Sequence, residues 1–455
     1  MTDEPGSEQA GDPSGSEDAD RAARLAALLS VTIGSERDPA QDDLPSRPPA
    51  RSRSTTEPAA DVVPSGAGSR VRVGVGRGAW ALLAVLVLVG SGLAYAGTRV
   101  LRASTTGEVL APVVDPAAPG YEALVDPSPT LVVQHDVDGE LDSLTVLSLA
   151  TPEGAGGGGV LLVPTRTLAD LPMLGETTVD TVYDPAQPQV QSDAVGQLLG
   201  VGIQESASVS DDRWADLVAP VAPIEIDNPN QLLEDGAVRF EAGAIELAPE
   251  DVGPYLRATV EGESDLARLF RHETFWVAWL DAVAADGSDA AVPGELDSGI
   301  GRFVRALART DHEVETLPVE EGSPDDAGTE VVDLGDEPVF SPRSEQMRAL
   351  VDRLVPLPLS PAPGVRARVR ILNGTSDIAE AADVAGRLPP AGVTVTIIGN
   401  AQTLDVEETA IEYAGDEFRD EAEAVAEILG VGTLVEETRP SDAVDITVTL
   451  GADHD

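Results

Sequence analysis

The sequence predicts an α/β protein in which two folded domains follow a single membrane-spanning helix. Three observations support this prediction. Residues 79–96 form an uncharged apolar stretch, strand-like and helix-like segments alternate over residues 128–357, and a shorter β-α-β-β-α-β order follows over residues 365–453. The prediction is therefore a single-pass membrane protein with one larger α/β domain and a small C-terminal α/β sandwich domain.

The apolar stretch has the length of a membrane span. As a helix, residues 79–96 extend about 27 Å, close to a hydrocarbon core of roughly 30 Å. Trp80 and Tyr95 lie near its two ends, where aromatic rings favour the headgroup level. A buried core helix and a signal peptide are the alternatives, but a signal peptide is expected much nearer the N-terminus. We predict a transmembrane helix over residues 79–97.

The arginines around the span predict its orientation. Arg70, Arg72 and Arg77 precede it, whereas Arg99 and Arg102 follow it. Basic residues are enriched on the cytoplasmic side of a membrane span. We therefore expect a cell-membrane protein with a cytoplasmic N-terminus and extracellular C-terminal domains.

Three segments lack the pattern of a folded domain. Residues 1–69 are rich in Ser, Pro, Gly, Asp and Glu and predict a disordered cytoplasmic tail. Within that tail, residues 20–33 carry leucines on one helical face. They either dock a partner as a short helix or are too short to persist as one. Residues 103–127 and 358–364 are rich in proline and predict linkers.

Composition excludes several classes of function. All 29 basic residues are arginine, there are 80 acidic residues, and the net charge is −51. Such a chain repels nucleic-acid phosphates, so we expect no nucleic-acid partner. The absence of lysine removes the Walker A motif. The absence of cysteine excludes thiolate zinc sites and cysteine nucleophiles.

The larger domain begins with a strong hairpin signal. The run LVVQHDVDGELDSLTVLSL places two apolar strand-like segments around Asp138-Gly139, a common two-residue hairpin turn. Residues 160–163 predict a further strand. Ser264 or Asp265 caps the longest amphipathic helix. The predicted helices lie at residues 193–199, 212–218, 264–283, 300–308 and 344–354.

The smaller domain shows a regular alternation of elements. Strands are predicted at residues 366–372, 393–398, 408–413 and 446–450, and helices at residues 378–388 and 416–429. The tripeptide Asn373-Gly374-Thr375 is either a strand-to-helix turn with its cap or a binding loop. The order fits a small α/β sandwich.

The smaller domain resembles the LytR C-terminal domain of actinobacterial envelope proteins. The resemblance is carried by VRILNGTSDIAEAADVAGRL, by GVTVTIIGNA and by the closing DITVTLGAD, and it covers most of residues 365–453. It implies an exported module associated with the cell wall.

The larger domain is similar to the LytR-CpsA-Psr (LCP) domain. The run YLRATVEGESDLARLFRH carries this resemblance, with Arg257, Asp265, Arg268 and Arg271 at the positions of the family pattern. The family transfers glycopolymers from polyisoprenyl pyrophosphate to wall acceptors. The resemblance implies arginines that hold the pyrophosphate, an acidic residue that helps to bind a divalent metal such as Mg, and an apolar tunnel for the polyprenyl chain.

Several family motifs are broken. The early Asp-x-Arg becomes His135-Asp136-Val137-Asp138, and the Pro-Arg-Asp motif becomes Pro164-Thr165-Arg166-Thr167, which displaces the arginine by one residue. Thr259 replaces the second arginine of an Arg-x-Arg pair, and residues 177–183 lack a family lysine. Each charge-assisted hydrogen bond contributes roughly 1.5–3 kcal/mol, so these losses weaken pyrophosphate binding by orders of magnitude.

The residues leave alternatives open at each candidate position. Arg257, Arg268, Arg271 and Arg166 are a residual pyrophosphate or anion site, or they pair with the many carboxylates of the chain. Asp136 is a remnant metal ligand or an ordinary residue beside a hairpin turn. The four histidines share no ligand spacing. Trp276 and Trp279 are expected in the core rather than against lipid.

These observations predict a non-catalytic accessory protein of cell-wall assembly that faces the envelope. Its expected partners are the membrane, a wall polymer or polyprenyl-linked glycan, and other envelope proteins. The alternative is an active LCP phosphotransferase that uses a rearranged arginine set including Arg166. No catalytic residue is assigned in either case.

Overall fold

The computed structural model describes most of the chain after the predicted span. The described residues are 113–154, 156–172, 174–234, 236–260, 263–323, 337–375, 379–437 and 443–454. The predicted tail, the possible helix at 20–33 and the predicted span at 79–97 lie outside these ranges. Within them, no helix is both long and apolar enough to cross a membrane.

A five-stranded mixed sheet is the centre of the middle domain. Its strand order is β12-β4-β3-β2-β7. The Asp-Gly hairpin is present as predicted: β2 and β3 pair antiparallel, with Asp138 at φ 57° and Gly139 at φ 89° in the turn. The bounds are β2 (Thr130–Val137), β3 (Glu140–Leu149), β4 (Gly158–Val163), β7 (Glu205–Val209) and β12 (His312–Thr316).

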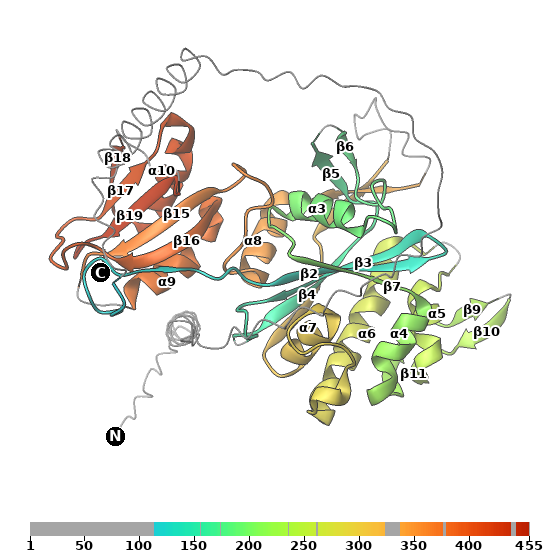
Figure 1. Ribbon diagram of the computed structural model, residues 1–455. Helices are drawn as coiled ribbons and strands as arrows, with labels where there is room; N and C mark the ends of the chain where they lie inside the picture. The colour runs from blue at the N-terminus through green and yellow to red at the C-terminus, as the bar shows by residue number, and fades with distance from the viewer. Residues whose placement is uncertain are drawn as a thin grey trace, which may run out of the picture. The chain divides into compact units, whose positions relative to one another are not determined.

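Helices cover both faces of this sheet, which makes three layers (Figure 1). Leu131 and Val133 of β2 pack on one face with helices α4 (Asp211–Val218), α5 (Val252–Arg257), α6 (Asp265–Asp286) and α7 (Gly299–Ala308). Val132 packs on the opposite face with α3 (Pro188–Leu199) and α8 (Ser344–Leu354). Side chains alternate across a strand, so a nearly continuous apolar run fills both cores.

Helix α6 is the longest described helix, and its ends follow from local chemistry. The Ser264 hydroxyl accepts a hydrogen bond from the Ala267 backbone N–H at 3.3 Å, as an N-cap does. Gly287 ends the helix at φ 69°, a conformation that favours glycine. The predicted cap is therefore confirmed.

Four two-stranded ribbons surround the central sheet, and sequence periodicity did not indicate them. They pair β5 (Leu168–Leu171) with β6 (Gly175–Thr178), β8 (Ile224–Asn228) with β11 (Gly243–Leu247), β9 (Leu232–Glu234) with β10 (Ala237–Phe240), and β13 (Val319–Gly322) with β14 (Val339–Pro342). Short 3-10 turns occur at Ala219–Val221, Pro249–Asp251, Asp289–Ala291, Pro389–Ala391 and Asp416–Phe418.

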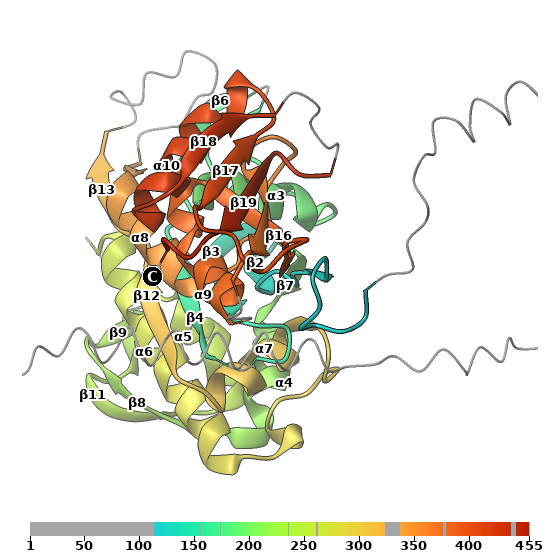
Figure 2. The ribbon, with the colours of Figure 1, turned by 90° about the vertical axis from the view of Figure 1, so that its left-hand side faces the viewer.

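The C-terminal domain is a six-stranded sheet with its own core (Figure 2). The strand order is β1-β16-β15-β19-β17-β18, and α9 (Glu380–Arg387) and α10 (Arg419–Leu429) pack on it. Besides β1 (Glu122–Leu124), its strands are β15 (Ala367–Asn373), β16 (Val393–Asn400), β17 (Ala410–Tyr413), β18 (Thr433–Glu436) and β19 (Ile446–Leu450).

Part of the predicted linker belongs to this sheet. Strand β1 (Glu122–Leu124) lies within residues 103–127 and pairs antiparallel with β16. The physical reason is that β16 would otherwise present a free edge of unpaired N–H and C=O groups. The linker prediction is therefore wrong for these three residues.

The tripeptide at the end of β15 is a turn. The Asn373 side-chain Oδ1 accepts hydrogen bonds from the backbone N–H and the hydroxyl of Thr375, each at 2.9 Å. This geometry is the side-chain-to-backbone bonding of an Asx turn. It supports the turn rather than the binding loop.

Candidate functional site

A buried histidine lies between two carboxylates at the end of β2. The His135 side chain is 1% exposed. Its Nδ1 lies 3.1 Å from a carboxylate oxygen of Asp142 on β3, and its Nε2 lies 2.9 Å from one of Asp211 at the start of α4. One imidazole therefore links strands β2 and β3 to the start of helix α4.

Two of the predicted arginines extend this arrangement. Arg268 of α6 donates to the Asp142 carboxylate at 3.0 Å and to the Asp142 carbonyl oxygen at 2.8 Å. Arg257, at the end of α5, donates to Asp211 at 3.0 Å. The result is a continuous series, Arg268–Asp142–His135–Asp211–Arg257, which we call the ion-pair chain.

The carboxylates favour the charged form of His135. Burial is the largest influence and lowers the His135 pKa, but hydrogen bonds and charges from Asp142 and Asp211 together raise it above its ordinary value. Burial also raises the pKa of Asp142, yet His135 and Arg268 bring it down to about 2. Alternating charges therefore stabilise one another in the interior.

A second histidine nearby is neutral. Burial, and then the charge of Arg268, lowers the pKa of His272 to about 3. Its Nε2 lies 3.0 Å from the Leu256 carbonyl oxygen, which accepts the ring N–H. The pKa values of the two buried histidines are thus shifted in opposite directions, because only His135 lies between two carboxylates.

The opposite pKa shifts give a pH-dependent prediction. His135 has a raised folded pKa, so its stabilising charge is fully present below its unfolded pKa of about 6.5 and is lost as pH rises through the folded value. We expect His135→Gln to be less stable than the wild type below about pH 6.5, with the gap narrowing at higher pH. Urea unfolding of the full chain in non-ionic micelles, followed by tryptophan fluorescence, measures this gap.

The matched control is His312→Gln, which removes a histidine outside the ion-pair chain that contacts the Thr310 carbonyl oxygen. This variant should follow the wild-type pH profile. A His135→Gln gap that stays constant from about pH 5.5 to about pH 9 would contradict the assignment.

The other two predicted arginines do not join the ion-pair chain. Arg271 is fully buried and donates to the Glu263 carboxylate and the Ala258 carbonyl oxygen. Arg166 donates to the backbone carbonyl oxygens of Glu337 at 3.0 Å and Pro338 at 2.9 Å. Each of the four candidate arginines therefore contacts acceptors of the protein itself.

Asp136 contacts protein donors. Its carboxylate accepts a 2.5 Å hydrogen bond from the Tyr183 hydroxyl and a 3.2 Å bond from the Gly139 backbone N–H. Burial, and then the hydrogen bond to Asp136, raises the pKa of Tyr183 to about 12. In the described part of the chain, no group of three or more His, Asp or Glu side chains is arranged to hold a metal ion. Around Asp136, the described residues therefore do not supply the cluster of ligands that a divalent metal needs.

Aromatic side chains fill the space between α6 and the sheet. Trp276 and Trp279 are 1% and 0% exposed, as predicted for core residues. Their ring centroids are 5.2 Å apart, and Trp279 lies 5.7 Å from Trp214 and 5.8 Å from Phe275. These rings form a packed core cluster in which each edge or face meets a neighbour.

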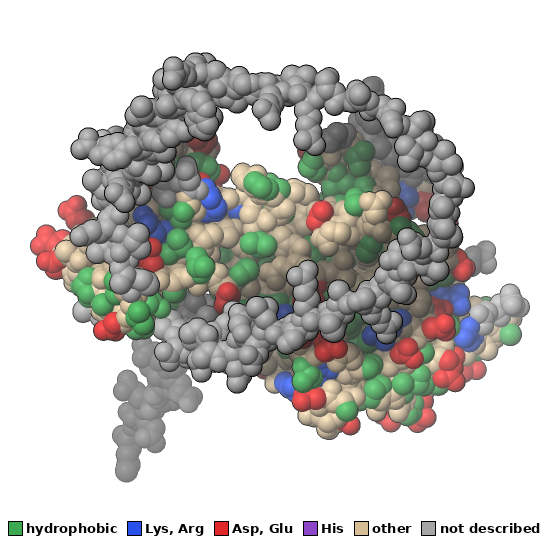
Figure 3. All heavy atoms as spheres, viewed as in Figure 1, with side chains coloured by type: hydrophobic (Ala, Val, Ile, Leu, Met, Phe, Trp, Pro, Cys, Tyr) green, Lys and Arg blue, Asp and Glu red, His purple; other side chains and the backbone are tan. Residues whose placement is uncertain are grey.

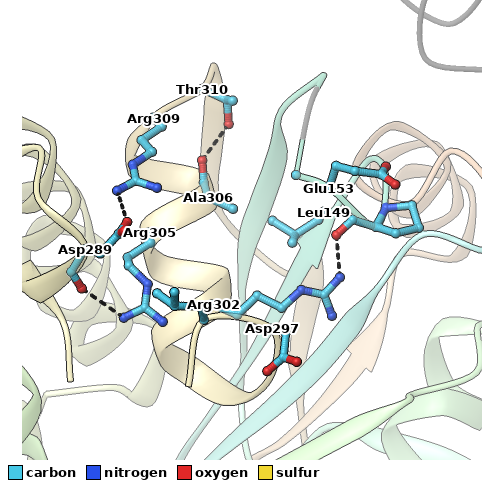
Figure 4. A pocket seen from close by; sticks show the side chains of 12 residues that line it. Leu149, Glu153, Asp289, Asp297, Arg302, Arg305, Ala306, Arg309 and Thr310 are labelled. Carbon is cyan, nitrogen blue, oxygen red and sulfur yellow. Dashed lines mark hydrogen bonds and ion pairs between the residues drawn. The ribbon is translucent and has the colours of Figure 1, made fainter. Parts of the chain in front are cut away.

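Sequence reasoning missed a second group of arginines. Arg302, Arg305 and Arg309 line a cavity of about 570 Å³ beside α7 (Figure 4). Arg302 donates to the Pro152 carbonyl oxygen at 2.5 Å, Arg305 to that of Val292 at 2.5 Å, and Arg309 to Asp289 at 2.6 Å. The spacing of these three arginines along one side of α7 could have been recognised in the sequence. In the structure, their contacts attach neighbouring loops to α7.

Residues 366–454 match the family described as "LytR cell envelope-related transcriptional attenuator". The C-terminal domain is a LytR C-terminal domain. This confirms the resemblance that the sequence showed for that part of the chain. A search of curated proteins gave no match.

Among solved structures, the chain is similar to B. subtilis TagV at 18% identity, over 50% of this chain and 97% of TagV, with a TM-score of 0.41. It is similar to the LytR-CPS2A-psr family protein YwtF (TagT) with bound octaprenyl pyrophosphate lipid at 13% identity (50% and 89% covered, TM-score 0.38). It is also similar to the LytR-Csp2A-Psr enzyme from Actinomyces oris at 17% identity (52% and 94% covered, TM-score 0.38).

Proposed function

We propose that this chain is a non-catalytic, membrane-anchored accessory protein of cell-wall assembly that faces the envelope. It binds wall glycopolymer, a lipid-linked intermediate or another envelope protein. The LytR C-terminal domain supports an envelope role, since its family description names the cell envelope. The apolar stretch at residues 79–97 supports the membrane anchor and the extracellular position of the domains.

The observation that carries the non-catalytic part is the neutralisation of the candidate arginines. A pyrophosphate would have to displace Asp142 from Arg268 and Asp211 from Arg257, and these carboxylates would then repel it. Each charge-assisted bond contributes roughly 1.5–3 kcal/mol, so the exchange brings little gain. Acidic side chains are also spread over the face drawn in Figure 3.

The same geometry argues against the active phosphotransferase. That alternative needs Arg166 at a shared site with the arginines of α5 and α6. Arg166 instead holds the backbone ahead of β14, through the carbonyl oxygens of Glu337 and Pro338.

Turnover assays test the proposal directly. We expect the full chain in micelles to release no product above background from a polyprenyl-pyrophosphate-linked glycan, with or without Mg²⁺. Clear transfer or pyrophosphatase activity, lost in both Arg257→Ala and Arg268→Ala, would establish the enzyme instead. Arg257 is included because its side chain is 39% exposed, so its loss spares the fold. External protease on intact cells should degrade both domains if they lie outside.

A further inference from the structure

An apolar groove lies on the outer face of the middle domain, between α6 and β8. Its volume is about 650 Å³. Helix α6 supplies one wall with Phe270 and Val277, and β8 supplies the other. The groove is separate from the ion-pair chain, because Arg268 is buried on the inner side of α6 while Phe270 points outward.

The α6 wall of the groove includes exposed hydrophobic side chains. Phe270 is 54% exposed and Val277 is 41% exposed. They are seven residues apart, so they lie two turns apart on one side of α6. The opposite side of the helix is already apolar and buried, through Phe275 and Trp279. Phe270 and Val277 are therefore exposed apolar residues outside the buried stripe of α6.

The rim of the groove is acidic. Glu225 and Asp227 of β8 line one wall, and Glu273 and Asp281 of α6 line the other. In the described residues, no arginine or histidine forms an ion pair with any of these four carboxylates. Burial, and then the charge of Glu315, raises the pKa of Glu273. Elsewhere in the domain the half-buried carboxylates Asp142 and Asp211 each contact a cation.

We propose that this groove docks a basic amphipathic helix of a partner protein, with its apolar stripe on Phe270 and Val277 and its basic side chains on the four carboxylates. From Phe270 to Asp281 the wall extends about 16 Å, which matches three helical turns. The acidic rim repels anionic lipid headgroups and teichoic-type phosphates. A small cation would leave Phe270 uncovered. A helix laid in a groove satisfies both features.

The docking proposal for the groove and the proposed non-catalytic function can be tested independently. The groove lies away from the candidate arginines, so its failure leaves the non-catalytic assignment intact. Its success gives the chain a protein partner and deepens the accessory role.

A defined peptide tests the proposal. The probe is an 18-residue helical peptide with leucines along one side and arginines on both flanks, titrated into the full chain in non-ionic micelles at about 0.15 M salt. We expect one peptide to bind per chain. Phe270→Ser should weaken binding about tenfold or more, as truncation of a central aromatic anchor does. The triple variant Asp227→Asn, Glu273→Gln, Asp281→Asn should weaken it similarly.

Two controls separate docking from general attraction to an acidic protein. The first is a peptide of identical composition whose scrambled order gives it no apolar face, and it should bind much more weakly. The second is a triple variant on the LytR C-terminal domain, Glu417→Gln, Asp420→Asn and Glu427→Gln, which removes the same charge from exposed positions. Equal binding of the two peptides, wild-type affinity in Phe270→Ser, or an equal loss in the control triple would each overturn the proposal.

Discussion

Asp142→Asn should lower the free energy of unfolding of the middle domain by about 3 kcal/mol at pH 7. The Asp142 carboxylate stands between two buried cations: Arg268, whose side chain is 8% exposed, and His135. Without it, the Arg268 charge stays buried with one fewer counter-ion, and the charged form of His135 is disfavoured. Breaking a buried pair from one side is more damaging than the net value of the pair, because an uncompensated charge remains.

Asp265→Asn is the matched control. Asp265 lies 3.4 Å from the same Arg268 guanidinium, but its side chain is 31% exposed. Exposed pairs contribute about 0–1 kcal/mol, so this variant should unfold close to the wild type. Tryptophan fluorescence reports mainly the middle domain, since three of the four tryptophans, Trp214, Trp276 and Trp279, lie in it. The ion-pair chain is not a stabilising unit if the two variants lose the same free energy.

A second readout separates the charge effect from general damage. In Asp142→Asn the imidazole keeps only the carboxylate of Asp211, so the His135 pKa should fall. Proton or nitrogen NMR of the ring measures that change. A stability loss with an unchanged His135 titration would place the damage elsewhere.

The sequence predicted the elements better than the partners of its charged residues. The Asp-Gly turn and the cap of α6 depend on neighbours a few residues apart, so their chemistry is visible in a linear chain. The pairing of Arg268 with Asp142 joins residues 126 positions apart. Periodicity gives no information about such a contact, and family spacing alone placed Arg268 at an anion site.

His135 is a second residue whose long-range contacts could not be predicted from the sequence. In the sequence it is one of four histidines that share no ligand spacing, whereas in the structure it is the centre of the ion-pair chain. Its partner Asp211 is 76 residues away. The short ribbons, such as β8 with β11, were not among the predicted strands. Unlike the apolar run at 160–163, β8 and β11 each include acidic residues and lack a continuous apolar run.

The second large effect is expected at Trp279. Trp279→Ala should cost about 3–5 kcal/mol, the range for emptying an aromatic site in a packed core. Trp279 is fully buried and stacks against Phe275 at an interplanar angle of 25°. Its neighbours Trp214 and Trp276 are anchored on helices α4 and α6, which limits their collapse into the space left behind. The urea midpoint followed by circular dichroism measures the loss.

Two further variants on α6 sharpen this result. Trp279→Phe keeps most of the ring and removes an indole N–H that is buried without a hydrogen-bond partner in the protein, so it should cost far less than the alanine variant. Phe270→Ala, on the exposed side of the same helix, should change stability by no more than about 0.5 kcal/mol. A polyprenyl tunnel lined by Trp279 would remove this difference in stability between the two alanine variants. A side chain facing an open channel has few contacts to lose, so Trp279→Ala would then resemble Phe270→Ala. A large, selective loss at Trp279 instead means that its ring is part of a packed core, as its contacts with Trp214, Phe275 and Trp276 indicate.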